Sequence, residues 1–185
     1  MLVGSAAMLV ALSLSGCFAQ ETPDATSSPS PSTTPVFASE EEALAAATKA
    51  YENYLKVSDE ISDDGGANAE RLREVATEEQ YQREVVDYQE LIDDEIHTVG
   101  ETLIDSVSIQ SFDASPKEGD TSVTLYACVD VSGIELFDDG NNNITPRNRV
   151  NRISMEATFD WYEPRLLMSG GVAWVGNDFC NGQRH

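Results

Sequence analysis

Residues 121–132 read Thr-Ser-Val-Thr-Leu-Tyr-Ala-Cys-Val-Asp-Val-Ser, and this stretch decides the fold class. Apolar side chains at 123, 125, 127, 129 and 131 alternate with more polar ones, which is the period of a strand with one buried face. The segments 102–112, 151–163 and 165–175 show a similar alternation, and turn signals or a polar loop at 137–149 separate the four segments. We therefore expect four antiparallel strands in meander order.

Before Gly100 the apolar residues recur at helical spacing instead. Ser39-Glu40-Glu41-Glu42 and Thr77-Glu78-Glu79-Gln80 both have the form of a capping box, in which a hydroxyl accepts a backbone N–H bond at a helix start. They predict helices over about 40–57 and from 78 onward, with a short helix at 69–76 between them. Three helices followed by four strands predict an α+β fold, with the helices packed on one face of a curved antiparallel sheet.

This element order resembles the cystatin-like roll of the nuclear-transport-factor superfamily, over about residues 39–182. In that superfamily a curved sheet wraps a long first helix and leaves a conical pocket. Its members include ketosteroid isomerases, dehydratases, polyketide cyclases and non-catalytic lipoprotein domains. The resemblance implies that any ligand site lies between the first helix and the sheet. No catalytic motif of these enzymes matches residues of this chain, so no catalytic role is carried over.

The N-terminus carries the signals for export. Residues 2–14 are an apolar run shorter than the ~20 residues of a transmembrane helix, which is typical of a signal peptide, although no Lys or Arg precedes it. Leu14-Ser15-Gly16-Cys17 closes the run and resembles the bacterial lipobox, which implies cleavage before Cys17 and attachment of diacylglycerol to its thiol. The predicted location is the extracytoplasmic side of the cell membrane, through a lipid anchor.

Residues 18–38 are rich in Ser, Thr and Pro and cannot bury a core, so we expect a disordered linker. It is similar to the stalks of lipoproteins from high-GC Gram-positive bacteria, the actinobacteria. The predicted organisation is a signal peptide at 1–16, a lipidated cysteine and linker at 17–38, and an α+β domain at 39–182.

The net charge and the cysteines limit which partners and which compartment are expected. The net charge of −22 disfavours nucleic acid and flat adsorption on anionic lipid. With Cys17 lipidated, Cys128 and Cys180 remain, and an exported protein can keep a disulfide between them. Two buried free thiols are the alternative. An envelope protein or a small ligand is the expected partner.

One acid and several aromatic residues are candidates for a pocket. Asp105 interrupts the apolar series Leu103-Val107-Ile109, so a regular strand would turn its carboxylate toward the core, where a raised pKa suits a general base. A bulge, a salt bridge or another strand phase would place it elsewhere. The aromatic candidates for the same pocket, or for ordinary core, are Tyr51, Tyr54, Tyr88, Trp161 and Trp174.

The sequence offers little else for catalysis. His97 follows three acidic residues at a helix end, His185 is the last residue, and neither has a recognisable nucleophile beside it. No zinc spacing or phosphate loop is present. In the Asp- and Asn-rich run at 138–143, the calcium-loop pattern would need its glycine where Ile144 stands and its glutamate where Val150 stands. We predict no catalytic residue, metal or cofactor. The favoured hypothesis is a lipid-anchored binding or accessory domain; the alternatives are a pocket enzyme of isomerase or dehydratase type and a structural part of an envelope assembly.

Overall fold

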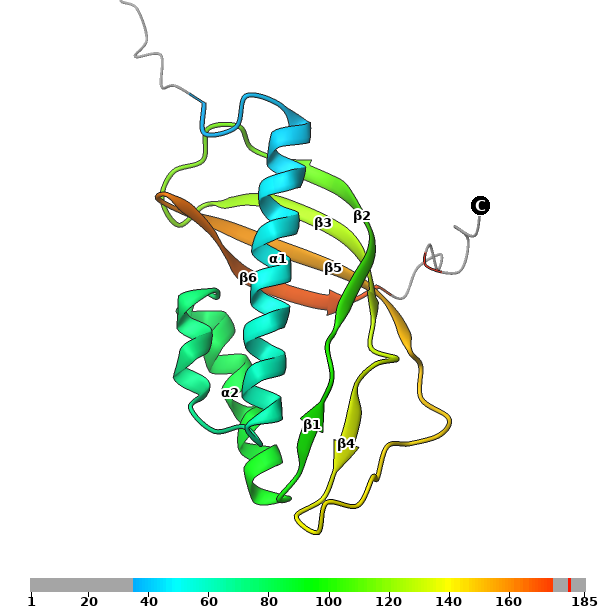
Figure 1. Ribbon diagram of the computed structural model, residues 1–185. Helices are drawn as coiled ribbons and strands as arrows, with labels where there is room; N and C mark the ends of the chain where they lie inside the picture. Colours follow the sequence, from blue (N-terminus) through cyan, green and yellow to red (C-terminus); the bar gives the residue numbers. More distant parts are fainter. Residues whose placement is uncertain (1–34, 175–179, 181–185) are drawn as a thin grey trace, which may run out of the picture. The chain divides into compact units, whose positions relative to one another are not determined.

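The computed structural model describes residues 35–174 and Cys180, and in this part of the chain helices pack on an antiparallel sheet (Figure 1). The helical segments are α1 (Glu40–Asp63), the 3-10 helix η1 (Ala69–Glu74) and α2 (Glu78–Asp93). The strands are β1 (His97–Val99), β2 (Leu103–Phe112), β3 (Thr121–Asp130), β4 (Glu135–Phe137), β5 (Arg152–Tyr162) and β6 (Arg165–Ala173). The predicted α+β fold class is confirmed.

Both capping sequences start helices. Ser39 Oγ accepts a hydrogen bond from the backbone N–H of Glu42 at 3.2 Å, and Thr77 Oγ1 accepts one from Gln80 at 3.3 Å. The Glu42 carboxylate accepts from the backbone N–H of Ala38 at 2.8 Å, which ties the preceding chain to the helix start. α1 runs six residues beyond the predicted end at 57, because Ile61 in its last turns is fully buried and extends the packed face.

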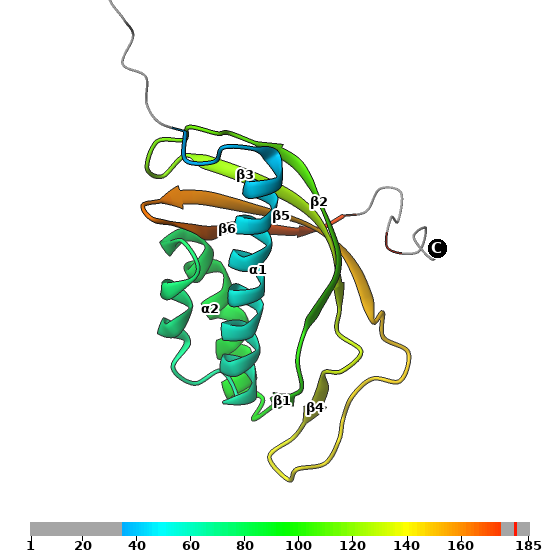
Figure 2. The same ribbon diagram turned by 45° about the horizontal axis from the view of Figure 1, so that its top comes forward.

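The main sheet has the strand order β2-β3-β5-β6, and all its pairs are antiparallel. Figures 1 and 2 show that it curves and that α1 and α2 lie on the same side of it. A second, two-stranded sheet pairs β1 with β4, which the sequence did not predict because each strand has only three residues.

The core lies between α1 and the sheet face that we call the inner face. Ala127 on β3 pairs with Val107 on β2 and Met155 on β5, so these three side chains share that face. Tyr51 from α1 and Phe159 from β5 are the largest fully buried side chains here, with ring centroids 5.9 Å apart in an edge-to-face contact. Burying each such side chain contributes roughly 1.5–3 kcal/mol.

A β-bulge changes the phase of β2. The register shifts between Ile104 and Ser106, so Asp105 is the extra residue on its strand. Ile104, Val107 and Ile109 therefore pack against the core, whereas Leu103 is 57% exposed. The prediction that Leu103 shares the face of Val107 is wrong for this reason.

No helix in the described part of the chain has the length and apolar character needed to cross a membrane. The predicted signal peptide, Cys17 and most of the linker lie outside the described residues.

Candidate functional site

A cavity of about 260 Å³ lies between α1, α2 and the inner face of the sheet, and we call it the tyrosine cavity. Tyr51 and Tyr54, both predicted as pocket residues, line it from α1. The sheet contributes an apolar wall made of Val129, Val131, Ile153, Met155, Met168 and Gly171. A Cβ at Gly171 would lie 2.9 Å from the Met168 methyl carbon, so a side chain there would have to displace the end of Met168.

The opposite wall is polar and is positioned by α2. Gln80 is 3% exposed, and its carbonyl oxygen accepts hydrogen bonds from Arg83 Nε at 3.1 Å and Nη2 at 2.6 Å. This fixes the amide so that Nε2 faces the cavity, where it donates to Glu84 Oε1 at 2.6 Å and makes a longer contact of 3.5 Å to Tyr54 Oη. Gln80 and Glu84 are one helical turn apart, so α2 presents both to α1.

The Tyr51 hydroxyl is a further polar group in the wall of the cavity. Tyr51 is 2% exposed, and its ring packs between Tyr54 and Phe159. Among the described residues no group makes a hydrogen bond to its Oη, and no fully enclosed side-chain polar atom lacks a partner. The hydroxyl therefore borders the open volume of the cavity. A bound molecule that pairs with this hydroxyl would gain one hydrogen bond.

Burial sets the charge state of the phenols. Burial, and then the nearby Glu84 carboxylate, raises the pKa of Tyr51 and of Tyr54 well above the ordinary value for tyrosine. The pKa of Tyr88 rises to about 12 for the same main reason. The raised pKa values disfavour the phenolate form of all three residues, so the phenols stay neutral and can donate hydrogen bonds.

Tyr88 lies beside the cavity and lines a neighbouring surface hollow. Its hydroxyl is 2.8 Å from that of Ser58 on α1. The hollow of about 380 Å³ between α1 and α2 is lined by Tyr88, Ser58 and Glu84, and the last two also line the tyrosine cavity. Asp87, Glu90 and Asp94 surround this hollow, so the surface beside the cavity is negatively charged.

The other predicted pocket residues lie elsewhere. Trp161 is on the inner face, but near the N-terminal end of α1. Its ring meets that of Phe37 edge-on there, with the ring centroids 6.1 Å apart. Trp174 packs against Tyr126 on the opposite, outer face of the sheet, with the two ring centroids 5.0 Å apart. The prediction that these two rings share a pocket with Tyr51 is wrong, since β6 turns Trp174 to the other face.

Asp105 is also outside the cavity. The bulge turns its carboxylate to the outer face, where Arg152 Nε donates a hydrogen bond to Oδ2 at 2.6 Å. The Arg152 guanidinium also donates to the backbone oxygen of Cys180. The prediction of an inward-facing acid at 105 is therefore wrong, and the alternatives of a bulge and a salt bridge are both realised.

The outer face carries the predicted disulfide between Cys128 on β3 and Cys180. Both cysteines are at most 1% exposed, so the disulfide is buried. No group of three or more His, Cys, Asp or Glu side chains among the described residues is arranged to hold a metal ion.

Solved structures offer one informative comparison. The fold resembles that of the intermembrane space region of the chloroplast protein ARC6. The TM-score is 0.51 at 15% sequence identity, and the match covers 70% of this chain and 95% of that chain. At this identity the likeness concerns the fold alone. No family model and no curated protein sequence matches the chain.

Sequence reasoning missed Gln80 and Glu84. The capping box explained Gln80 as a helix-start residue, and Glu84 was one of many acids in the helices. The available signal was their spacing, because residues 80, 84 and 88 follow one stripe of α2 and the stripe ends at the buried Tyr88.

Proposed function

We propose that the chain is a non-catalytic, lipid-anchored domain on the extracytoplasmic side of a membrane, and that it binds a small ligand in the tyrosine cavity. The observation that carries this proposal is the Tyr51 hydroxyl, which is neutral, borders the open volume of the cavity and has no hydrogen-bond partner among the described residues. That volume is slightly below the ~300–1,000 Å³ of ordinary ligand pockets, so the ligand is compact.

The lining defines the chemistry of this ligand. Glu84 is the one formally charged side chain among the described residues that line the cavity, and the neighbouring hollow is acidic. The Tyr51 hydroxyl offers a neutral hydrogen-bonding group. The sheet side offers only apolar contacts. A compact ligand with an apolar body and an ammonium group, or another hydrogen-bond donor, satisfies all three features.

A catalytic role has less support. The isomerase or dehydratase alternative required Asp105 as the base, and that carboxylate is paired with Arg152 on the outer face. The tyrosines of the cavity do not replace it, because their raised pKa values disfavour the phenolate. The alternative of a structural envelope component needs no cavity at all.

Two features support the location. The Cys128–Cys180 disulfide persists in oxidising compartments, which are found outside the cytoplasm. Leu14-Ser15-Gly16-Cys17 supplies the anchor. Mass spectrometry of the protein from its native membrane should find a diacylglycerol-modified Cys17 at the N-terminus. Cys17→Ser should leave the precursor uncleaved or release the protein, and an unmodified N-terminal residue would refute the anchor.

Binding is tested with three probes of similar shape and different charge. Phenethylammonium should bind saturably by calorimetry, 2-phenylethanol more weakly and phenylacetate least, because Glu84 attracts a cation and repels an anion. Glu84→Gln should remove most of the preference for the amine. Tyr51→Phe removes only the hydroxyl and should weaken amine binding by roughly threefold to tenfold, the worth of one hydrogen bond.

Matched controls make the test specific. Tyr126→Phe is the same change on the outer face, and Glu41→Gln is the same change in the exposed first turn of α1. Neither should alter amine binding by more than twofold. Absence of saturable binding by any probe, or equal effects of the cavity and control substitutions, would refute the proposed site.

A further inference from the structure

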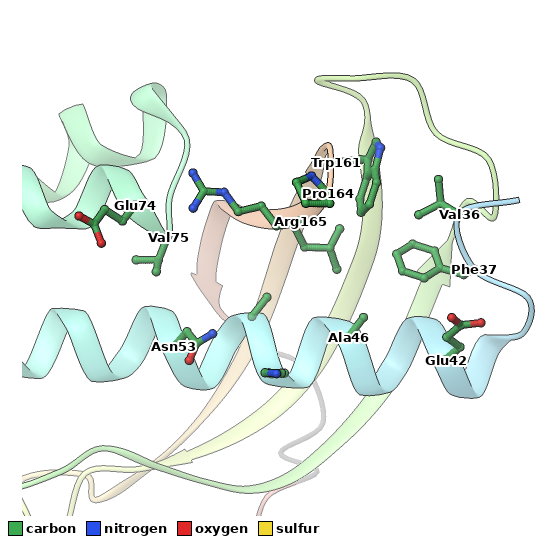
Figure 3. A pocket seen from close by; sticks show the side chains of 13 residues that line it. Val36, Phe37, Glu42, Ala46, Asn53, Glu74, Val75, Trp161, Pro164 and Arg165 are labelled. Atoms are coloured by element: carbon green, nitrogen blue, oxygen red, sulfur yellow. The ribbon is translucent and has the colours of Figure 1, made fainter.

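A second hollow, separate from the tyrosine cavity, lies between α1 and the β5–β6 hairpin, and we call it the hairpin groove (Figure 3). Its volume is about 570 Å³, and it shares no lining residue with the tyrosine cavity. Phe37 and Trp161 stand near one end, and Val75 stands at the other.

The sequence of α1 explains why the groove stays open. Glu42, Ala46, Lys49, Ala50 and Asn53 fall on one helical stripe that forms its wall. The two alanines are too short to reach the hairpin opposite, where Trp161, Arg165 and Leu166 form the other wall. From residue 42 to residue 53 the helix rises about 16 Å, so the groove suits an elongated molecule.

The charges of the groove depart from those of the rest of the molecule. Most basic side chains in the described part of the chain are already engaged. Five form ion pairs with Asp or Glu, namely Lys56, Arg71, Arg73, Arg83 and Arg152, and Arg149 donates to two backbone carbonyls. Within that part, the side chains of Lys49, Lys117, Arg147 and Arg165 make no ion pair and no hydrogen bond, and two of these four line the groove.

Two carboxylates also line the groove, one near each end. Glu42 accepts the N–H of Ala38, which occupies one of its oxygens at the Phe37 end. Glu74 lies at the opposite end beside Val75, and Figure 3 shows the Arg165 side chain on the hairpin side of the same end. Lys49 lines the groove from α1 and Arg165 lines it from the hairpin, which also supplies the apolar surface of Trp161 and Leu166.

We propose that the hairpin groove binds an elongated amphipathic anion. Its carboxylate or phosphate contacts Lys49 and Arg165, and its apolar body lies along Leu166, Trp161 and Phe37. Guanidinium and ammonium groups are the side chains that hold such anions in proteins. In a chain of net charge −22 the general field repels anions, so anion binding requires a local arrangement of free cations. This site is independent of the tyrosine cavity and of its ligand.

Tryptophan fluorescence gives a direct readout, because the chain has two tryptophans and one of them lines the groove. In a Trp174→Phe background, Trp161 is the sole reporter. Dodecanoate and dodecyl phosphate should each change its emission saturably. Dodecanol, which has the same chain and no charge, should bind at least tenfold more weakly. Dodecylammonium has the same chain and the opposite charge. The net negative charge of the protein favours this cation, so weaker binding of dodecylammonium than of dodecanoate would show that the groove itself selects the anion.

Substitutions then locate the anion. Lys49→Gln with Arg165→Gln should weaken dodecanoate binding at least tenfold. Lys117→Gln with Arg147→Gln removes the same charge at the two free cations outside the groove and should change it less than threefold. Glu74→Gln removes the competing carboxylate beside Arg165 and should strengthen it. Tighter binding of dodecylammonium or dodecanol than of dodecanoate, or equal weakening by both double variants, would overturn the proposal.

Discussion

The carboxylate of Asp105 on β2 is paired with the guanidinium of Arg152 on β5, on the face of the sheet opposite α1. Each side chain is about one-third exposed. Arg152 also reaches the backbone of Cys180, so this one guanidinium connects the bulge of β2 to the segment that carries the disulfide. The pair is therefore part of how the outer face is held together and is remote from the tyrosine cavity.

Asp105→Asn should consequently act on stability alone. We expect the free energy of unfolding to fall by about 1 kcal/mol, since a partly exposed, hydrogen-bonded ion pair contributes an amount of this order. Urea unfolding measures it, and Arg152→Gln should cost a further amount even when Asp105 is Asn, because it also removes the hydrogen bond to the backbone of Cys180. Amine binding in the tyrosine cavity should be unchanged. A variant that keeps its stability but loses ligand binding or a measurable turnover would restore Asp105 as a site residue.

The disulfide should be a major contributor to stability. Cys128 and Cys180 are 52 residues apart in sequence. In the chain-entropy model a closed loop of this size is worth about 4 kcal/mol, although measured values are often smaller. Replacing both cysteines with Ala should lower the urea midpoint markedly, and dithiothreitol should affect the wild-type protein but not the variant. Non-reducing peptide mapping should recover the linked pair; free reaction of both thiols with maleimide in the unfolded, unreduced protein would contradict it.

The sequence predicted the strands better than the faces that they present. Residues 121–132 alternate regularly, and β3 indeed turns Val123, Leu125 and Ala127 to the core. In β2 the same reasoning held for Val107 and Ile109 but failed for Leu103 and Asp105, because a bulge adds one residue at 105 and reverses the phase of the strand before it. A period-two pattern contains no signal for such an insertion when the inserted residue is an acid that could face either way.

The site was predictable in part for a similar reason. Helical spacing correctly brought Tyr51 and Tyr54 to the sheet side of α1. Trp161 lies on the same side of the sheet, but near the N-terminal end of α1. Periodicity shows which face of an element a residue is on, but it does not show which turn of a helix lies opposite a given strand residue. Gln80 and Glu84 were missed since their role depends on how α2 packs beside α1, which is a tertiary property.

The hydroxyl pair of Ser58 and Tyr88 should couple the two helices energetically. Tyr88 is 4% exposed, and its hydroxyl lies 2.8 Å from that of Ser58. Tyr88→Phe and Ser58→Ala should each cost about 1 kcal/mol, as is typical for one buried hydrogen bond. A double-mutant cycle by urea unfolding should give a coupling of about 0.5–1.5 kcal/mol. Strict additivity of the two losses would show that the contact contributes nothing.

Asp59 should make the stability depend on pH in an unusual direction for an acid. Its two carboxylate oxygens accept hydrogen bonds from the backbone N–H and the hydroxyl of Thr102, each at 2.7 Å. Burial nevertheless raises the pKa of Asp59 above its usual value, outweighing the opposing effect of these bonds. The folded protein therefore binds a proton at Asp59 more readily than the unfolded chain does. The contribution of this group is fully present below its unfolded pKa, near 3.8, and is lost as the pH rises through the folded pKa.

The measurement is the difference in unfolding free energy between wild type and Asp59→Asn, which keeps the shape of the side chain and removes its titration. This difference should shift in favour of the wild type as the pH is lowered from about 7 to about 4, because only the wild type gains the preferential protonation. Asp63→Asn, at an exposed position of the same helix, controls for the general effect of removing a negative charge. A difference that stays constant over this range, or that moves in favour of Asp59→Asn as the pH falls, would mean that the Thr102 hydrogen bonds outweigh burial at this carboxylate.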